Sequence, residues 1–195
     1  MKSVALHNLG CKVNSYEMDV MQQMLQERGY EIVPFDENAD IYIVNTCSVT
    51  NIADRKSRQM LHRAKKKNPK AVVVAVGCYV QTGKEEIEKD PCIDLAIGNN
   101  KKKEMVAILE SYLEEMESAN DVDHVLINAK TSAVIDINHT DEYEEMQLQK
   151  TAEHTRAYIK IQDGCNQFCS YCIIPYARGR VRSRRKEDIM HEVNA

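Results

Sequence analysis

The feature that most constrains this chain is the stretch GCNQFCSYC at residues 164–172. Cys165, Cys169 and Cys172 follow one another at spacings of four and three, so three thiols on one short loop can reach a single inorganic centre. Thiolates are soft ligands, suited to zinc, copper(I) or an iron–sulfur cluster. Structural zinc sites and simple electron-transfer clusters normally take four protein ligands. Three ligands leave one metal position open for chemistry. The alternatives are a chance group of free thiols, or a zinc site with a distant fourth ligand.

Length and cysteine content narrow the setting of this loop, whose three cysteines we call the loop triplet. The chain has 195 residues, enough for one full domain and part of another. No apolar stretch reaches the length of a membrane span, and the first residues turn polar too early for a secretory signal. We therefore expect a cytoplasmic protein with no membrane partner. In that compartment seven cysteines indicate metal or redox chemistry rather than disulfides.

Charge is divided unevenly along the chain. The net charge is -4, but residues 110–153 hold 12 acidic and 2 basic side chains, which leaves 18 acidic and 24 basic elsewhere. The basic part carries the cysteines, which favours an anionic partner at the working surface, although a solvated charged face explains it equally well.

Short apolar runs alternate with amphipathic stretches over the first 120 residues. The pattern predicts strands at 4–6, 31–33, 41–45, 71–76 and 93–97, separated by helices at 13–28, 52–67, 84–89 and 101–117. Such alternation predicts an α/β fold, with a mainly parallel sheet and helices on both faces. Residues 121–155 are acidic and read as an interdomain linker. A strand at 157–161 and a helix at 186–193 then begin a second domain at 156. Because a barrel needs about 200 residues or more, we expect the sequence to be part of a longer protein.

A second group of thiols follows three predicted strands. Cys11, Cys47 and Cys78 each come just after the carboxyl end of a strand, and we call them the strand-end triplet. Ligands of open parallel sheets bind outside these strand ends, so the three thiols are expected to converge. Gly10 and Gly77 allow close backbone approach there. The alternative is three unrelated buried cysteines. Cys92 and all six histidines lack ligand spacing and are interpreted as packing or surface residues.

The cysteine motifs resemble those of a known enzyme family. The pattern C-x-x-x-C-x-x-C of the loop triplet is similar to the cluster motif of radical S-adenosylmethionine enzymes. The strings QDGCNQFCSYCIIPYARGRVRSR, LGCKVNSYE, NTCSVTNIADRKSRQ and VGCYVQ look like the methylthiotransferase branch of that family. The resemblance covers nearly the whole chain and includes six cysteines in their expected contexts.

This resemblance implies a fold and two cofactor sites. Residues 1–120 would form the amino-terminal cluster-binding methylthiotransferase domain, and residues 156–195 the first β-α unit of a radical S-adenosylmethionine partial barrel. The loop triplet would hold a [4Fe–4S] cluster whose open iron binds S-adenosyl-L-methionine, with Tyr171 contacting the adenine. The strand-end triplet would hold a second [4Fe–4S] cluster. The domain linker must then bring the two open irons to one substrate pocket.

The implied reaction is methylthiolation of C2 of an adenine. That C–H bond is not acidic, so general acid–base chemistry cannot break it, whereas a cofactor radical can. The second cluster would supply sulfur and a second S-adenosyl-L-methionine the methyl group. The reductant would be a donor such as flavodoxin or ferredoxin. No side chain is assigned as a catalytic acid or base.

The strings most resemble the subgroup acting on N6-threonylcarbamoyladenosine at tRNA position 37, in the anticodon loop. Alternatives are isopentenyladenosine in tRNA, a ribosomal-protein aspartate, or a non-catalytic iron–sulfur or zinc module that docks on RNA. Two groups of basic residues could bind RNA phosphates. The alternatives are solvated charged faces, cofactor binding and internal salt bridges. The first group is Arg55, Lys56, Arg58, Arg63, Lys65, Lys66 and Lys67, and the second is Arg178, Arg180, Arg182, Arg184 and Arg185.

Overall fold

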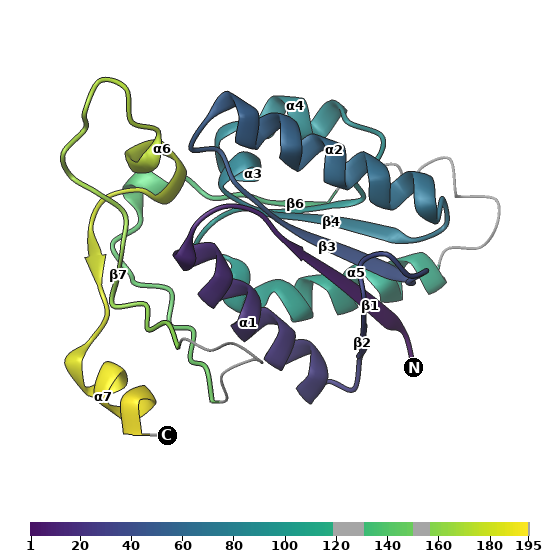
Figure 1. Ribbon diagram of the computed structural model, residues 1–195, viewed down its shortest axis with the longest axis horizontal. Coiled ribbons are helices and arrows are strands. Elements are labelled where there is room, and N and C mark those ends of the chain that lie inside the picture. The colour runs from purple at the N-terminus through teal and green to yellow at the C-terminus, as the bar shows by residue number, and fades with distance from the viewer. Residues whose placement is uncertain (119–130, 150–156, 195) are drawn as a thin grey trace.

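A computed structural model describes residues 1–118, 131–149 and 157–194. Its centre is a six-stranded sheet in the order β2-β1-β3-β4-β5-β6, in which every pairing is parallel (Figure 1). The predicted α/β class is therefore confirmed. The strands are β1 Ser3–Asn8, β2 Glu31–Val33, β3 Ile41–Thr46, β4 Val72–Gly77, β5 Leu95–Ile97 and β6 Thr131–Ala133.

Burial along the central strands explains their apolar sequences. Every residue of β3 and β4 is buried, because helices cover both faces of the sheet. On one face lie α1 Lys12–Glu27 and α5 Met105–Ser118, preceded by the short helix η1 Lys102–Glu104. On the other face lie α2 Asn51–Lys67, α3 Cys78–Thr82 and α4 Lys84–Lys89. Figure 1 shows the two helical layers above and below the strands.

The acidic region after α5 contributes to this core. Strand β6 pairs with β5 at the edge of the sheet, and Met146 and Leu148 are buried in the α1/α5 layer. A one-turn helix, η2 Ile137–His139, follows β6. Residues 131–149, which we predicted to be linker, therefore pack against the amino-terminal layer. The rest of the predicted linker, residues 121–130 and 150–155, lies outside the described residues.

The carboxyl-terminal segment has less regular structure than expected. The strand predicted at 157–161 is wrong: β7 is Gln162–Asp163 and pairs antiparallel with β8 Arg182–Ser183. Ile159 and Ile161 are 40% and 58% exposed while Lys160 points inward, so the apolar residues of this run do not face a core. Helices α6 Ile174–Arg178 and α7 Lys186–Asn194 complete the segment. Among the described helices, none is long and apolar enough to cross a bilayer.

Candidate functional site

The strand-end triplet lies where its strand positions predict. Cys11 immediately precedes α1, Cys47 follows β3 and Cys78 begins α3 directly after β4. Because β1, β3 and β4 are parallel neighbours, the three residues share one edge of the sheet. Cys47 and Cys78 are buried and Cys11 is exposed. At the carboxyl ends of these strands, two of the three cysteines are therefore buried and one is exposed to solvent.

The surroundings of Cys47 shift the pKa of its thiol in opposing directions. Burial raises the pKa of its thiol, and the nearby sulfurs of Cys78 and Cys11 raise it further, while the backbone N–H groups of Val49 and Ser48 oppose that rise. Hydrogen bonds to ligand sulfurs are a recurrent way of tuning iron–sulfur clusters. Three cysteine sulfurs with nearby backbone N–H groups therefore fit an iron–sulfur cluster.

Gly10 and Gly77 leave room at this edge. Gly10 has φ +107°, and a Cβ built on it would stand 2.8 Å from Cys47 Sγ. Gly77 has φ +100°, and its Cβ would stand 2.7 Å from Asn45 Oδ1. A side chain at either position would be both strained and crowded, so the close backbone approach expected from sequence is present.

The loop triplet lies between β7 and α6. The loop is held by backbone hydrogen bonds from Cys165 N to Gly179 O (3.0 Å) and from Cys172 N to Cys169 O (2.9 Å). Cys169 is exposed, and Cys165 and Cys172 are half-buried. Tyr171, the expected adenine contact, is 90% exposed and therefore free to meet a ligand.

One residue connects the strand-end triplet to α6, the helix that follows the loop triplet. The side-chain Nδ2 of Asn99 donates to Cys78 Sγ at 3.5 Å and to the carbonyl of Ala177, in α6, at 2.6 Å. Asn99 is 1% exposed. Because α6 follows the loop triplet, this amide fixes the loop's base beside a sulfur of the strand-end triplet. Figure 1 shows α6 beside α3, at the edge where β3 and β4 end.

A pocket of about 500 Å³ opens between the segment that follows Cys47 and the loop triplet, and we call it the shared pocket. One wall comes from the segment after Cys47 and from α2, α3 and α4; the other comes from the loop triplet and α6. Its lining includes the aromatic rings of Tyr79, Tyr171 and Tyr176 together with Cys172. Aromatic rings that flank a cavity are suited to stacking on a splayed nucleobase.

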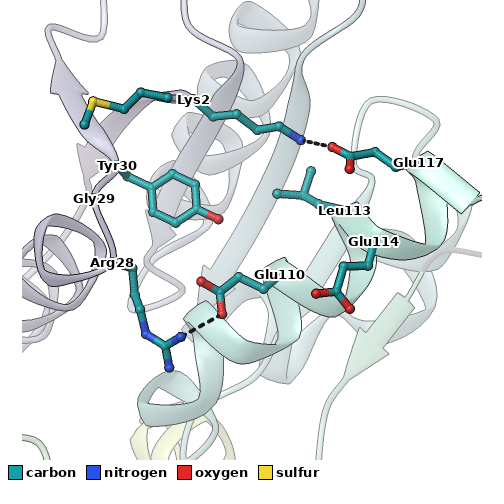
Figure 2. A pocket seen from close by; sticks show the side chains of 9 residues that line it. Lys2, Arg28, Gly29, Tyr30, Glu110, Leu113, Glu114 and Glu117 are labelled. Carbon is teal, nitrogen blue, oxygen red and sulfur yellow. Dashed lines mark hydrogen bonds and ion pairs between the residues drawn. The ribbon is translucent and has the colours of Figure 1, made fainter.

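A second pocket, of about 410 Å³, lies at the opposite end of the sheet (Figure 2). Lys2 pairs with Glu117 at 2.8 Å and Arg28 with Glu110 at 3.3 Å across it. These contacts join the start of β1 and the end of α1 to α5. The pocket contains no cysteine and is interpreted as a surface depression bridged by ion pairs.

Sequence reasoning missed a buried group of charges beside the triplets, which we call the Glu17 network. The Glu17 carboxylate, on α1, accepts from Lys160 Nζ at 2.7 Å and Arg178 Nη1 at 2.9 Å, and also from Lys102. Asp163 pairs with Lys160 at 2.6 Å and Arg178 at 2.9 Å. All five side chains are at most 6% exposed. The sequence signals were that Glu17 ends the family-like string LGCKVNSYE and that Asp163 and Arg178 lie in the string QDGCNQFCSYCIIPYARGRVRSR.

Both carboxylates of the Glu17 network have depressed pKa values, which predicts sensitivity to acid. Burial alone would raise the pKa of Glu17 and Asp163, but Arg178 and Lys160 lower both, and Lys102 also lowers that of Glu17. A carboxyl group whose folded pKa is depressed contributes stability above its unfolded pKa of about 4, and that stability is lost as pH falls through the folded value. Buried Glu144, whose pKa is raised by burial, opposes this trend.

We therefore expect the urea midpoint to be flat from about pH 7 to 5 and to fall below about pH 4. Glu17→Gln should flatten the decline, because one of the two responsible carboxylates is gone. An equal acid slope in both proteins would contradict the assignment.

The structure divides the two basic groups expected to contact RNA. On α2, Arg63 pairs with Asp36 and Lys65 with Asp94, whereas the exposed cations include Arg55, Lys56 and Lys66. After the loop, three arginines are buried and two exposed. The exposed ones are Arg180 and Arg185; Arg178, Arg182 and Arg184 are buried. Internal pairing, one of the alternatives considered, accounts for Arg178 and Arg184.

Within the described residues, three metal-ligand atoms come within 4.8 Å of one another only at His62, Asp90 and Cys92. His62 Nε2 and Asp90 Oδ2 are 2.7 Å apart, and Asp90 Oδ1 accepts the Cys92 N–H at 2.9 Å. The grouping was not expected from sequence. It is explained by an exposed ion pair next to a turn in which the aspartate accepts a backbone N–H.

The amino-terminal part of the chain matches a known protein family. Residues 3–98 match the model of the uncharacterized protein family UPF0004. The matched range covers strands β1 to β5 of the amino-terminal sheet, and we call residues 3–98 the UPF0004 domain. It includes all three residues of the strand-end triplet.

The UPF0004 domain and the segment after it are also similar to curated methylthiotransferases. The chain is 41% identical over 192 residues to threonylcarbamoyladenosine tRNA methylthiotransferase MtaB of Bacillus subtilis, covering 98% of this chain and 40% of that protein. It is 42% identical to MtaB of Aquifex aeolicus, covering 97% and 43%. Ribosomal protein uS12 methylthiotransferase RimO of Dictyoglomus thermophilum is 31% identical, covering 99% and 41%.

These comparisons confirm the resemblance to the methylthiotransferases, with higher identity to the first two relatives than to the third. The chain spans about 40% of the length of the curated relatives it matches. The cysteine assignments themselves remain predictions.

Proposed function

We propose that this chain is part of a tRNA methylthiotransferase that adds a methylthio group to C2 of N6-threonylcarbamoyladenosine at position 37. The observation that carries the proposal is the shared pocket, whose walls come from the loop triplet and from the segments that follow Cys47 and Cys78. Identity to relatives named for that reaction supports the choice of substrate. Residues 1–120 would be the cluster-binding domain, 121–155 a connecting segment and 156–195 the start of the radical domain.

In this proposal each triplet holds one [4Fe–4S] cluster. Cys11, Cys47 and Cys78 would hold one, and the loop triplet the other, with S-adenosyl-L-methionine at its fourth position. Together the bound groups supply radical chemistry, sulfur and a methyl group.

The protein's own contribution is placement and shelter. Tyr79 is fixed by hydrogen bonds from Arg58 Nη1 at 3.1 Å and to Glu86 at 3.0 Å, so its ring forms a firm wall of the shared pocket. Tyr171 and Tyr176 face it from the loop side and would orient the cofactor adenine or the substrate base by stacking. The exposed cations of α2 would bind the flanking phosphates.

Mass spectrometry of tRNA nucleosides tests the substrate. A strain lacking the complete gene should contain N6-threonylcarbamoyladenosine without its methylthio form, and the gene should restore that form. An unchanged methylthio level would contradict the substrate assignment. Loss of methylthio-isopentenyladenosine, or of the ribosomal-protein mark, would support the alternatives instead.

A further inference from the structure

We propose that Glu17 and Arg178 are positioning residues that fix the loop triplet against the UPF0004 domain, beside the strand-end triplet. The role of the triplets rests on the proposed function. The contact of Arg178 with Asn14 and Glu17, which we call the joint, does not depend on a bound cluster. It can therefore be tested separately on the cluster-free chain.

The contacts form a continuous path between the two triplets. Helix α1 begins directly after Cys11, and its first two turns carry Asn14 and Glu17. The Arg178 guanidinium donates to Asn14 Oδ1 at 2.6 Å and to Glu17 Oε1 at 2.9 Å. A forked donor that engages two acceptors restricts rotation as well as distance. Arg178 therefore docks the end of α6 onto the first turns of α1.

The path continues from Arg178 to the loop triplet through the backbone. The next residue, Gly179, accepts the N–H of Cys165 at 3.0 Å. Gly179 has φ +74°, and a Cβ built there would lie 2.4 Å from the carbonyl oxygen of Ile137. Gly164, before Cys165, is similarly crowded, with its Cβ position 2.0 Å from Arg180 O. A displacement of Arg178 would therefore also displace Cys165.

Charge explains why this joint is specific. Lys102, Lys160 and Arg178 converge on Glu17, and two of them also meet Asp163. Burial alone would lower the pKa of Arg178, but Glu17, Asp163 and then Cys78 raise it well above its usual range. The guanidinium therefore stays charged in a buried position beside the strand-end triplet. Moving α6 away would strand buried charges on both sides, which is costly.

Hydrogen–deuterium exchange on the cluster-free chain tests the joint. In Arg178→Met, the peptide containing the Cys165 amide should exchange at least about tenfold faster than in the wild type, while β3 and β4 keep their protection. Arg178→Lys should give intermediate protection, since it keeps the charge and loses the fork. Arg180→Met is the matched control, because Arg180 is exposed two residues away and contacts the Phe168 ring.

Wild-type protection of Cys165 in Arg178→Met would overturn the proposal, as would equal loosening by Arg180→Met. If Arg178→Met increases hydrogen–deuterium exchange throughout the sheet, Arg178→Lys is the deciding variant. Faster exchange confined to residues 157–178 in that variant supports the proposal. Unchanged exchange of those residues overturns it. Absence of iron from the purified protein would contradict the proposed function and leave these exchange results unaffected.

Discussion

Glu17→Gln is expected to lower the free energy of unfolding by about 3–5 kcal/mol at pH 7, the range found when one partner of a buried ion pair is removed. The neutral amide leaves Asp163 as the one charged carboxylate that Lys160 and Arg178 contact in the Glu17 network. It also removes the charge of the carboxylate that Lys102 contacts. Urea denaturation, followed by circular dichroism, measures the change.

Glu27→Gln is the matched control on the same helix. Glu27 is exposed and its carboxylate accepts from Gln23 at 2.9 Å, so its replacement should change stability by no more than about 0.5 kcal/mol. Comparable losses in the two variants would show that the buried charges carry no special weight.

Cys78→Ser, introduced into the complete gene, is expected to reduce the methylthio form of N6-threonylcarbamoyladenosine to below detection. Serine preserves the size of the side chain but removes a thiolate from the strand-end triplet, and a cluster held by three cysteines does not tolerate the loss of one. Nucleoside mass spectrometry of tRNA from the complemented strain measures the result.

Cys92→Ser serves as the control, because Cys92 belongs to neither triplet. It should leave the methylthio level unchanged. Full activity of Cys78→Ser would remove Cys78 from the proposed cluster site, and equal loss in both variants would indicate a general effect on folding.

The pattern of apolar residues along the sequence predicted most of the sheet, because the central strands are apolar on both faces. The expected runs at 41–45 and 71–76 correspond to β3 and β4, and their positions were enough to place Cys47 and Cys78 at one edge. The strand at 157–161 failed because Lys160 in that run turns inward to Glu17. Sequence pattern treats a lysine as a surface residue, and only the folded arrangement supplies its partners.

The candidate site was predictable in its ligands but not in its surroundings. Cysteine spacing and strand ends indicated both triplets. Glu17, Asn99 and Arg178 contribute through contacts between residues up to 164 positions apart, which no local pattern contains. The arginine-rich stretch shows the same limit, because burial separates Arg178 from exposed Arg180 although the two are nearly adjacent in sequence.

Iron and sulfide analysis after anaerobic reconstitution tests the central claim most directly. Two cubane clusters predict about eight irons and eight sulfides per chain, and about four of each when all three cysteines of either triplet are replaced by serine. Zinc without sulfide, or iron unaffected by loss of a triplet, would contradict the account.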